Sequence, residues 1–307
     1  MSVRQSRTAY IVATKDRPGE LRRLFDSLEA QAVFPGEVII VDAGQERVEA
    51  LCRNARPFPV RYLRSLPPSA ARQRNAGLSA VPPDICYVGF LDDDVVLNEG
   101  ALAAMDAFWD SAAGEVAGAA FTMRNHPALA WPSAKRTRFA ERLGLYSRRE
   151  GAVSPAGFQT MIGQPRTTTY VDWLPSGASV WRKEIFTRFR FDEWYGGYSY
   201  LEDLDFSYRV GKAHRLAVVA DAGYYHCPAS GGRGSGFEFG VREVLHRIYF
   251  VRKHAELSLA RCYLALAVRL AMNLALTFQE SNAYFLGRAW GNLIGLARSL
   301  GGMTASA

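Results

Sequence analysis

Three consecutive aspartates, Asp92–Asp94, directly follow the continuous apolar run Ile85–Leu91. Adjacent carboxylates in a site with little water repel one another unless a cation compensates their charge. Mg²⁺ and Mn²⁺ prefer oxygen ligands, and their protein sites commonly combine one or two carboxylates with phosphate oxygens of a substrate. The triplet therefore predicts a divalent metal that helps to bind a phosphorylated ligand. The alternative is an exposed acidic turn.

Two further strand candidates also end on polar residues. The β-rich run Tyr10–Thr14 stops at the turn signal Lys15–Gly19, and the apolar run Val38–Val41 is followed by Asp42. A continuous apolar run is typical of a strand covered on both faces, as in a parallel sheet. Because ligands of open parallel sheets bind beyond the carboxyl ends of the strands, we expect Thr14, Asp42 and the aspartate triplet to meet in one crevice.

The elements around these runs predict an α/β fold. Apolar residues spaced i, i+3, i+4 and i+7 in residues 21–28 indicate an amphipathic helix, and Ser69–Leu78 is helix-like after two prolines. Val60–Leu63 is a third strand candidate in this part of the chain. Further on, Glu202–Val210 is predicted as a helix and Leu216–Ala220 as a strand. The alternation favours a mainly parallel sheet flanked by helices.

Composition excludes several classes of protein. The 307 residues are 49% hydrophobic and 22% charged, which excludes a disordered chain. Four cysteines lie far apart without a CxxC pair, which excludes zinc-type spacing and a dense disulfide framework. The N-terminal residues lack the apolar stretch of a signal peptide, so we expect a cytoplasmic protein.

The net charge of +7 is unevenly distributed. Residues 241–307 hold eight Lys or Arg against three Glu, so the first 240 residues are close to neutral. We therefore predict one domain over residues 1–240 and a basic, amphipathic helical tail over residues 241–307. A basic tail can bind nucleic acid or an anionic membrane surface, and its surrounding residues decide between them.

The tail contains two predicted amphipathic helices. Cys262–Phe278 is similar to a membrane span, but it has 17 residues and is interrupted by Arg269, whereas a span needs about 20 apolar residues. Its polar residues share one helix face, opposite a broad apolar face, and Tyr284–Leu300 repeats the pattern. We expect peripheral binding to an anionic membrane surface; packing on the catalytic domain or a homodimer through these helices are the alternatives. The polar residues of the first helix are Arg261, Arg269, Asn273 and Thr277.

Four segments resemble the family 2 glycosyltransferases, which are inverting enzymes with a GT-A fold. They are Ile11–Pro18 (IVATKDRP), Val38–Gly44 (VIIVDAG), Arg74–Leu78 (RNAGL) running on to Phe90–Asp94 (FLDDD), and Glu202–Arg209 (EDLDFSYR). The resemblance covers roughly residues 8–230. It implies a nucleotide-binding half over about residues 8–125 and an acceptor half over about residues 126–240. The QxxRW motif of processive synthases is absent, which implies transfer of a single sugar, as in non-processive bacterial enzymes.

The resemblance also implies roles for individual residues toward the donor. Thr14 and Arg17 would line the nucleotide pocket, and Asp42 would hydrogen-bond the base. Arg74 would lie near the nucleotide or its diphosphate. Asp16 departs from the family pattern, because many relatives carry Asn between the Thr and the Arg. The full set assigned to the nucleotide sugar is Thr14, Arg17, Asp42, Arg74, Asp92 and Asp93.

Metal binding and proton transfer are assigned to three further residues by the same resemblance. Asp94 would ligate Mn²⁺ or Mg²⁺, and His226 lies where several relatives have another metal ligand. Asp203, the second residue of the Glu-Asp pair, is similar to the family's catalytic base. A metal can stabilise the leaving diphosphate, and a carboxylate can deprotonate the attacking hydroxyl. A helix N-terminal cap is the alternative for the Glu-Asp pair.

These assignments predict a metal-dependent inverting glycosyltransferase. It would move one sugar from a nucleotide-diphosphate sugar to a hydroxyl of a glycan or lipid-linked acceptor, as in cell-surface polysaccharide biosynthesis. One alternative is a sugar-phosphate nucleotidyltransferase, which needs a Gly-rich, Arg-containing loop after the first strand; TKDRPG fits this poorly. The other is a non-catalytic membrane or nucleic-acid binding module, which leaves the acidic strand ends unexplained. We expect no nucleic-acid partner.

Overall fold

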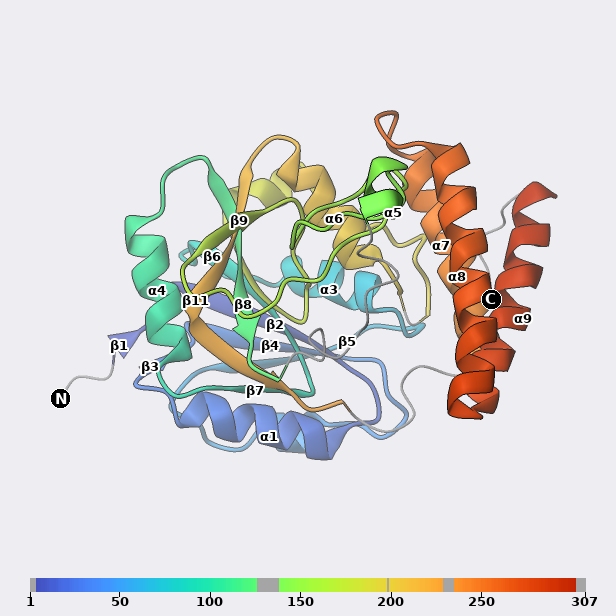
Figure 1. The fold of residues 1–307 in the computed structure, drawn as a ribbon. Coiled ribbons are helices and arrows are strands. Elements are labelled where there is room, and N and C mark those ends of the chain that lie inside the picture. The colour runs from blue at the N-terminus through green and yellow to red at the C-terminus, as the bar shows by residue number, and fades with distance from the viewer. Residues whose placement is uncertain (1–3, 126–137, 198, 229–234, 302–307) are drawn as a thin grey trace. The chain divides into compact units, whose positions relative to one another are not determined.

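The computed structural model describes residues 4–125, 138–197, 199–228 and 235–301 (Figure 1). The chain divides into two compact units, the first from residues 1–129 and 162–229 and the second from residues 130–161 and 230–307. The charge distribution predicted a boundary at residue 240 instead. Residues 138–161 belong with the C-terminal helices because they bond to them: Arg247 donates to the Gly157 carbonyl and to Gln159 (2.8 Å).

A sheet of nine described strands forms the centre of the first unit. Their order is β5-β4-β2-β6-β10-β8-β11-β7, with β9 paired to β11. A separate parallel pair joins β1 (Arg4–Gln5) to β3 (Val33–Phe34). The strands of the large sheet are β2 (Thr8–Thr14), β4 (Glu37–Asp42), β5 (Val60–Arg64), β6 (Tyr87–Asp92), β7 (Val95–Leu97), β8 (Val116–Met123), β9 (Thr169–Val171), β10 (Ala178–Arg182) and β11 (Arg215–His226).

Three strands of this sheet, β10, β7 and β9, run opposite to the others. β5, β4, β2 and β6 are parallel to one another, as the sequence predicted. β10 is antiparallel to β6 and β8, and β7 and β9 are antiparallel to β11. β8 and β11 are parallel to each other, so the sheet is mixed, with an unbroken run of four parallel strands in its N-terminal half. A parallel crossover needs a dozen or more residues, and the two residues between β6 and β7 are too few for one.

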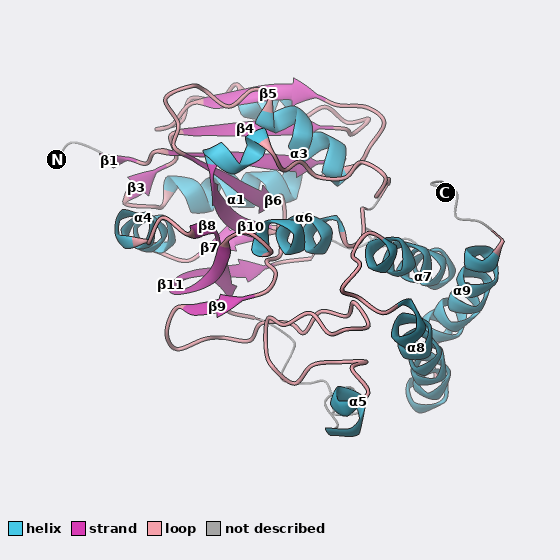
Figure 2. Ribbon diagram, turned by 90° about the horizontal axis from the view of Figure 1, so that it is seen from above, coloured by secondary structure: helices cyan, strands magenta, loops and turns pink. Residues whose placement is uncertain are grey.

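Helices cover both faces of the sheet (Figure 2). α1 (Pro18–Glu29), α2 (Glu49–Cys52) and α4 (Ala101–Ser111) contribute to one apolar cluster, and α3 (Ala70–Leu78) and α6 (Glu202–Gly211) contribute to another. Residues of β2 alternate between them: Tyr10 and Val12 belong to the first cluster and Ile11 to the second. A 3₁₀ helix, Lys183–Thr187, adds Ile185 and Phe186 to the second cluster. This burial on two faces is what the continuous apolar runs predicted.

The second unit is helical in its described residues. It contains α5 (Arg138–Arg142), α7 (Gly236–Arg252), α8 (Leu259–Glu280) and α9 (Ala283–Leu300), so both predicted tail helices are present. Of the helices in the described part of the chain, α8 is the one whose length and composition would allow it to cross a membrane. The polar face predicted on α8 is turned inward over most of its length, because Arg269 and Asn273 are buried.

Candidate active site

The aspartate triplet lies where β6 ends. Asp92 is the last residue of β6, and Asp93 and Asp94 form the turn into β7. Asp93 is buried and accepts hydrogen bonds from the Thr14 hydroxyl (2.8 Å) and the Arg17 guanidinium (3.0 Å). Burial raises the pKa of Asp93 to about 6, against the opposing effect of Arg17. The ends of β2 and β6 therefore meet, as predicted from the polar residues that follow them.

Asp94 and His226 come together from two paired strands. The His226 Nε2 lies 3.3 Å from the Asp94 Oδ1, and Arg17 lies 3.6 Å from the other carboxylate oxygen. The pairing of β7 with β11 sets His226 opposite Val95. Asn125 fixes the His226 backbone by accepting from its N–H (3.0 Å) and donating to its carbonyl (2.6 Å). The two residues predicted to ligate a metal are thus adjacent.

Arg74 connects the triplet to the Glu-Asp pair. From α3, its guanidinium donates to the Asp92 carboxylate (2.9 Å) and to the Glu202 carboxylate (2.6 Å). Arg74 is buried, whereas the Asp92 side chain is 40% exposed. Ser69 caps the N-terminus of α3 by accepting from the Arg72 backbone N–H. Arg74 thus holds two carboxylates in place, one at the end of β6 and one at the start of α6.

Glu202 and Asp203 are the first residues of α6. Burial and the adjacent Asp203 carboxylate raise the pKa of Glu202 to about 8, although Arg74 opposes the shift. Burial also raises the pKa of Asp203, while a hydrogen bond from the Leu204 N–H (2.7 Å) and the charge of Arg74 oppose it. Asp203 is half-buried. Its carboxylate therefore remains reachable, which a proton acceptor requires.

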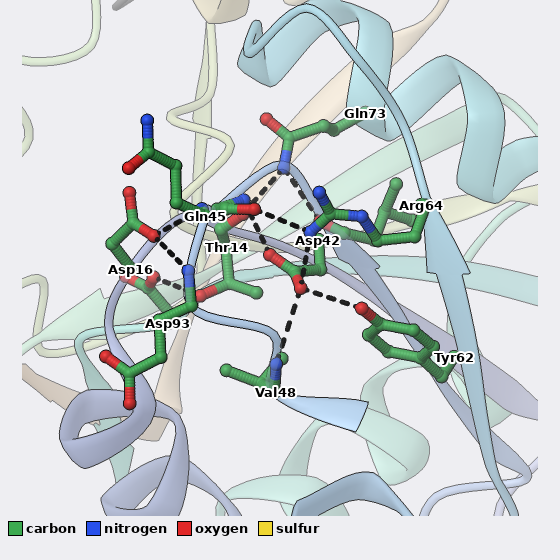
Figure 3. Close-up of polar contacts among 12 residues, drawn as sticks. Thr14, Asp16, Asp42, Gln45, Val48, Tyr62, Arg64, Gln73 and Asp93 are labelled. Carbon is green, nitrogen blue, oxygen red and sulfur yellow. Dashed lines mark hydrogen bonds and ion pairs between the residues drawn. The ribbon is translucent and has the colours of Figure 1, made fainter. Parts of the chain in front are cut away.

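Asp42 lies at the end of β4 but differs from the other aspartates, because its side chain is completely buried (Figure 3). The Gly44 N–H (2.7 Å) and the Val48 N–H (3.4 Å) donate to its carboxylate. The Tyr62 hydroxyl (2.8 Å) and Arg64 (2.9 Å) from β5 donate to it as well. The Asp42 carboxylate therefore anchors the loop after β4. Its predicted hydrogen bond to a nucleotide base would require that loop to move.

Two residues to which the sequence analysis gave no role, Gln73 and Asp16, bond to the backbone near the strand ends. Gln73 of α3 is buried and donates to the carbonyls of Thr14 (2.9 Å) and Val41 (2.7 Å), at the ends of β2 and β4. Asp16, with φ of 52°, accepts from the backbone N–H groups of Gln45 and Glu46 (2.6 and 2.9 Å). The departure of Asp16 from the family pattern was the signal for its role; Gln73 carried none.

Gly177 lies against the triplet and explains why a small residue is needed there. Its carbonyl accepts from the Asp92 N–H (2.8 Å). A Cβ on residue 177 would lie 2.9 Å from the Asp92 Oδ2, so any larger residue would push the Asp92 side chain aside. A glycine just before β10 thus allows the Asp92 side chain to keep its position.

The side chains at the strand ends suit a divalent cation that is bound partly by the protein and partly by a substrate. The residues that the structure describes contain no group of three or more His, Cys, Asp or Glu that could hold a metal alone. Asp94 and His226 offer one carboxylate and one imidazole, a combination that Mn²⁺ accepts. Such a cation would take its remaining ligands from phosphate and water, as is usual where a metal binds together with a nucleotide.

Two solved structures have a similar fold. TarS from S. aureus in complex with UDP-GlcNAc is 18% identical with a TM-score of 0.53, over 90% of this chain and 74% of that one. The mannosyltransferase PcManGT from Pyrobaculum calidifontis, in complex with GDP-Man and Mn²⁺, is 14% identical with a TM-score of 0.54, over 94% of this chain and 87% of that one. No curated protein matches the chain.

The sequence itself matches a family model over half of its length. The matched residues are 10–166, and the model is that of glycosyl transferase family 2. The match includes β2, β4 and β6 and therefore the strand ends that carry Thr14, Asp42 and the aspartate triplet. The predicted family, fold class and enzyme class are confirmed. The chain belongs to glycosyl transferase family 2 and is a glycosyltransferase with a GT-A fold.

Proposed function

We propose that this enzyme moves one sugar from a nucleoside diphosphate sugar to a hydroxyl of a glycan or lipid-linked acceptor, with Mn²⁺ or Mg²⁺ and with inversion at the anomeric carbon. The observation that carries the proposal is an excess of carboxylates at one place. In the described part of the crevice, Arg17 and Arg74 face five carboxylates. These are Asp92, Asp93, Asp94, Glu202 and Asp203.

An excess of negative charge favours a cation over a free anionic ligand. A diphosphate alone would be repelled by these carboxylates, whereas a diphosphate that arrives with a divalent cation is attracted. Asp94 and His226 would hold that cation, and the chemistry it supplies is neutralisation of charge on the leaving diphosphate. Arg17, 28% exposed and within 3.6 Å of Asp94, is placed to add a second positive charge.

Asp203 is the proposed general base. The acceptor hydroxyl gives its proton to the Asp203 carboxylate while its oxygen attacks the anomeric carbon, and the bond from that carbon to the diphosphate oxygen breaks. The raised pKa of Asp203 makes the carboxylate a stronger base than one in water. The Leu204 N–H orients one oxygen (2.7 Å). A single displacement with one base inverts the configuration.

Glu202 is not proposed as the base, although it is adjacent. Its carboxylate is buried and accepts from Arg74 at 2.6 Å, so it is held away from an acceptor. The hydrogen bonds that Glu202 and Asp92 accept instead fix the position of Arg74. We infer that the Glu202–Arg74–Asp92 chain keeps α6 and β6 at a constant separation, which sets the distance between base and donor site.

The donor class is supported by the two structural neighbours, whose complexes contain UDP-GlcNAc and GDP-Man with Mn²⁺. Because these donors differ in base and in sugar, they support a nucleoside diphosphate sugar without selecting one. The test is thermal unfolding of the full chain with UDP, GDP, CDP and dTDP sugars, each with and without Mn²⁺. We expect one nucleotide to stabilise the chain, and only with the metal.

Product analysis separates this function from the alternatives. A glycosyltransferase releases one nucleoside diphosphate per sugar transferred, and NMR of the product gives the anomeric configuration. Release of pyrophosphate from a nucleoside triphosphate and a sugar phosphate would instead identify a nucleotidyltransferase. Absence of stabilisation by every nucleotide in the panel would contradict a donor site in the crevice.

A further inference from the structure

The second unit has a polar interior. Glu243 of α7 is 2% exposed and accepts from Arg269 of α8 (3.0 Å) and from Arg288 of α9 (2.7 and 3.0 Å). Asn292 of α9 donates to Glu243 (3.2 Å) and accepts from Asn273 of α8 (2.7 Å). The helices α7, α8 and α9 lie side by side (Figure 2), and one buried carboxylate and its partners join them.

The contact between α7 and α9 is built from glycines. A Cβ on Gly240 of α7 would lie 2.3 Å from the Arg288 carbonyl oxygen, and one on Gly291 of α9 would lie 2.1 Å from the Phe237 carbonyl oxygen. Gly287 and Gly295 continue the same row at intervals of four residues and also face α7. The two backbones therefore touch.

The exterior of α8 and α9 is apolar instead. From Cys262 to Phe278, every fully exposed residue of α8 is Ala, Val, Leu or Phe, and they recur at helical spacing. Phe278 is 84% exposed and Trp290 of α9 is 58% exposed. We call this surface the outer face. Its large side chains are Leu264, Val268, Leu274, Phe278, Leu286, Trp290, Leu293 and Leu300.

In α7, α8 and α9 the polar residues and glycines lie inside and the large apolar residues lie outside. This is the reverse of the arrangement in helices that pack together in water. In water, burial of Leu, Phe and Trp drives helices together, at about 25 cal/mol for each Å² removed from solvent. In lipid that drive is absent between helices, and small residues with polar side chains form the contacts. The arrangement of α7, α8 and α9 is therefore typical of helices that face lipid.

We propose that the outer face of α8 and α9 lies on an anionic lipid bilayer, with both helices in the plane of the interface. An orientation across the bilayer would place α8 in lipid on all sides, whereas Arg269 and Asn273 fix one side of it against α7 and α9. In-plane binding buries the apolar stripe and leaves this network intact. The sequence predicted Arg269 on the polar face of a membrane-binding helix. In the structure Arg269 contacts Glu243 and is not available to lipid headgroups.

Charge around the outer face favours an anionic bilayer over a second copy of the chain. In residues 236–300, all of which are described, five Lys or Arg are not buried, against three Glu. Arg261 and Arg298 are exposed at the same end of the α8–α9 hairpin, where Tyr263 and Ser299 share a hydrogen bond (3.1 Å). These cations complement anionic headgroups, and the exposed Trp290 suits the headgroup boundary.

Flotation of the full chain with vesicles tests the proposal. We expect binding to phosphatidylcholine vesicles that contain phosphatidylserine, weaker binding to pure phosphatidylcholine, and partial release by high salt. A variant with Leu286→Gln, Trp290→Gln and Leu293→Gln should lose at least about tenfold in partitioning, since each side chain buried in lipid contributes roughly tenfold or more. Leu66→Gln, at an exposed leucine of the first unit, is the matched control and should bind like wild type.

A second variant and two further measurements decide among the other outcomes. Arg261→Gln with Arg298→Gln should weaken binding to anionic vesicles only and reduce its salt dependence. Circular dichroism should show unchanged helix content in both variants, because the substituted residues are exposed. No binding to either vesicle, with a dimer in light scattering that the triple variant dissociates, would overturn the proposal in favour of a self-association surface. Resistance to carbonate extraction would overturn it in favour of a membrane span.

Discussion

Two buried arginine–carboxylate clusters in this chain have opposite charge balance. In the crevice of the first unit, the described residues set two arginines among five carboxylates, and the pKa of Asp93 rises to about 6 and that of Glu202 to about 8. In the second unit, Arg269 and Arg288 surround the single carboxylate Glu243, and its pKa falls to about 2. Burial is similar, so the number of compensating charges decides the direction.

The difference separates a site from a structural element. Glu243 has its charge and its hydrogen bonds satisfied within the protein, and such a network fixes helix packing without needing a ligand. In the described part of the first cluster the carboxylates outnumber the arginines that contact them, which favours a cation and a phosphorylated substrate. Substitutions that remove a charge should therefore affect activity in the first cluster and stability in the second.

The largest expected effect follows loss of the proposed base. Asp203→Asn should lower turnover by about 10²–10⁴-fold, because a positioned base contributes that much to rate. Donor binding, measured by thermal shift with nucleotide and Mn²⁺, should be almost unchanged. Glu202→Gln serves as the comparison, since it removes the carboxyl group that accepts from Arg74 but leaves the base. Turnover of Asp203→Asn close to wild type would reassign the base to Glu202 or Asp205.

In the second cluster, removal of the carboxylate charge should lower the stability of the protein without changing its catalytic activity. Glu243→Gln should lower the unfolding free energy by about 3–5 kcal/mol, because it leaves two buried arginines without their counter-charge. Helical circular dichroism during denaturation measures this, and Glu256→Gln, at an exposed glutamate, is the matched control. Sugar transfer below the unfolding temperature should stay near wild type. A stable Glu243→Gln variant would contradict the structural role.

The same cluster predicts a dependence of stability on pH. The pKa of Glu243 is lowered from 4.5 to about 2, because the two arginines outweigh the effect of burial. A lowered pKa stabilises the folded state above pH 4.5, and the contribution of about 3 kcal/mol is lost as pH falls from 4.5 to 2. The difference in unfolding free energy between wild type and Glu243→Gln should therefore narrow across that window. A constant difference would contradict the assigned shift.

Loss of the proposed metal ligand Asp94 should have a smaller effect on the unfolding free energy than loss of the Glu243 charge. Asp94→Ala should abolish the metal-dependent stabilisation by nucleoside diphosphate, which amounts to about 2.7 kcal/mol for a ligand at 100 times its Kd. Without nucleotide, the variant should unfold near the wild-type temperature. Asp84→Ala, at an exposed aspartate of the preceding turn, should keep the full effect of Mn²⁺. Equal metal dependence in both variants would reassign the ligand.

The parts of this structure that sequence predicted are those with strong periodicity or a strand end. β2, β4 and β6 and their terminal Thr14, Asp42 and Asp92 followed from continuous apolar runs, because such runs require cover on both faces. The antiparallel direction of β10 was not predicted. It depends on the long segment before this strand, and that segment has no periodic sequence pattern. The polar face of α8 was predicted from spacing alone, but its partner Glu243 lies on another helix, so its inward direction could not be.

The smallest expected effect concerns Asp42, whose carboxylate has four donors inside the protein and so resembles Glu243 more than its neighbours in the crevice. If Asp42 mainly anchors the loop after β4, Tyr62→Phe should lower the unfolding free energy by about 1.5 kcal/mol, the lower end of the range for a hydrogen bond to a charged group, because Tyr62 is half-buried. Turnover and the preferred nucleotide should not change. Tyr225→Phe, at an exposed tyrosine, is the control. If Asp42 binds the base directly, as the family resemblance implies, Tyr62→Phe should instead weaken the preferred nucleotide more than the others in the thermal-shift panel, because the freed carboxylate would lose its orientation toward the base.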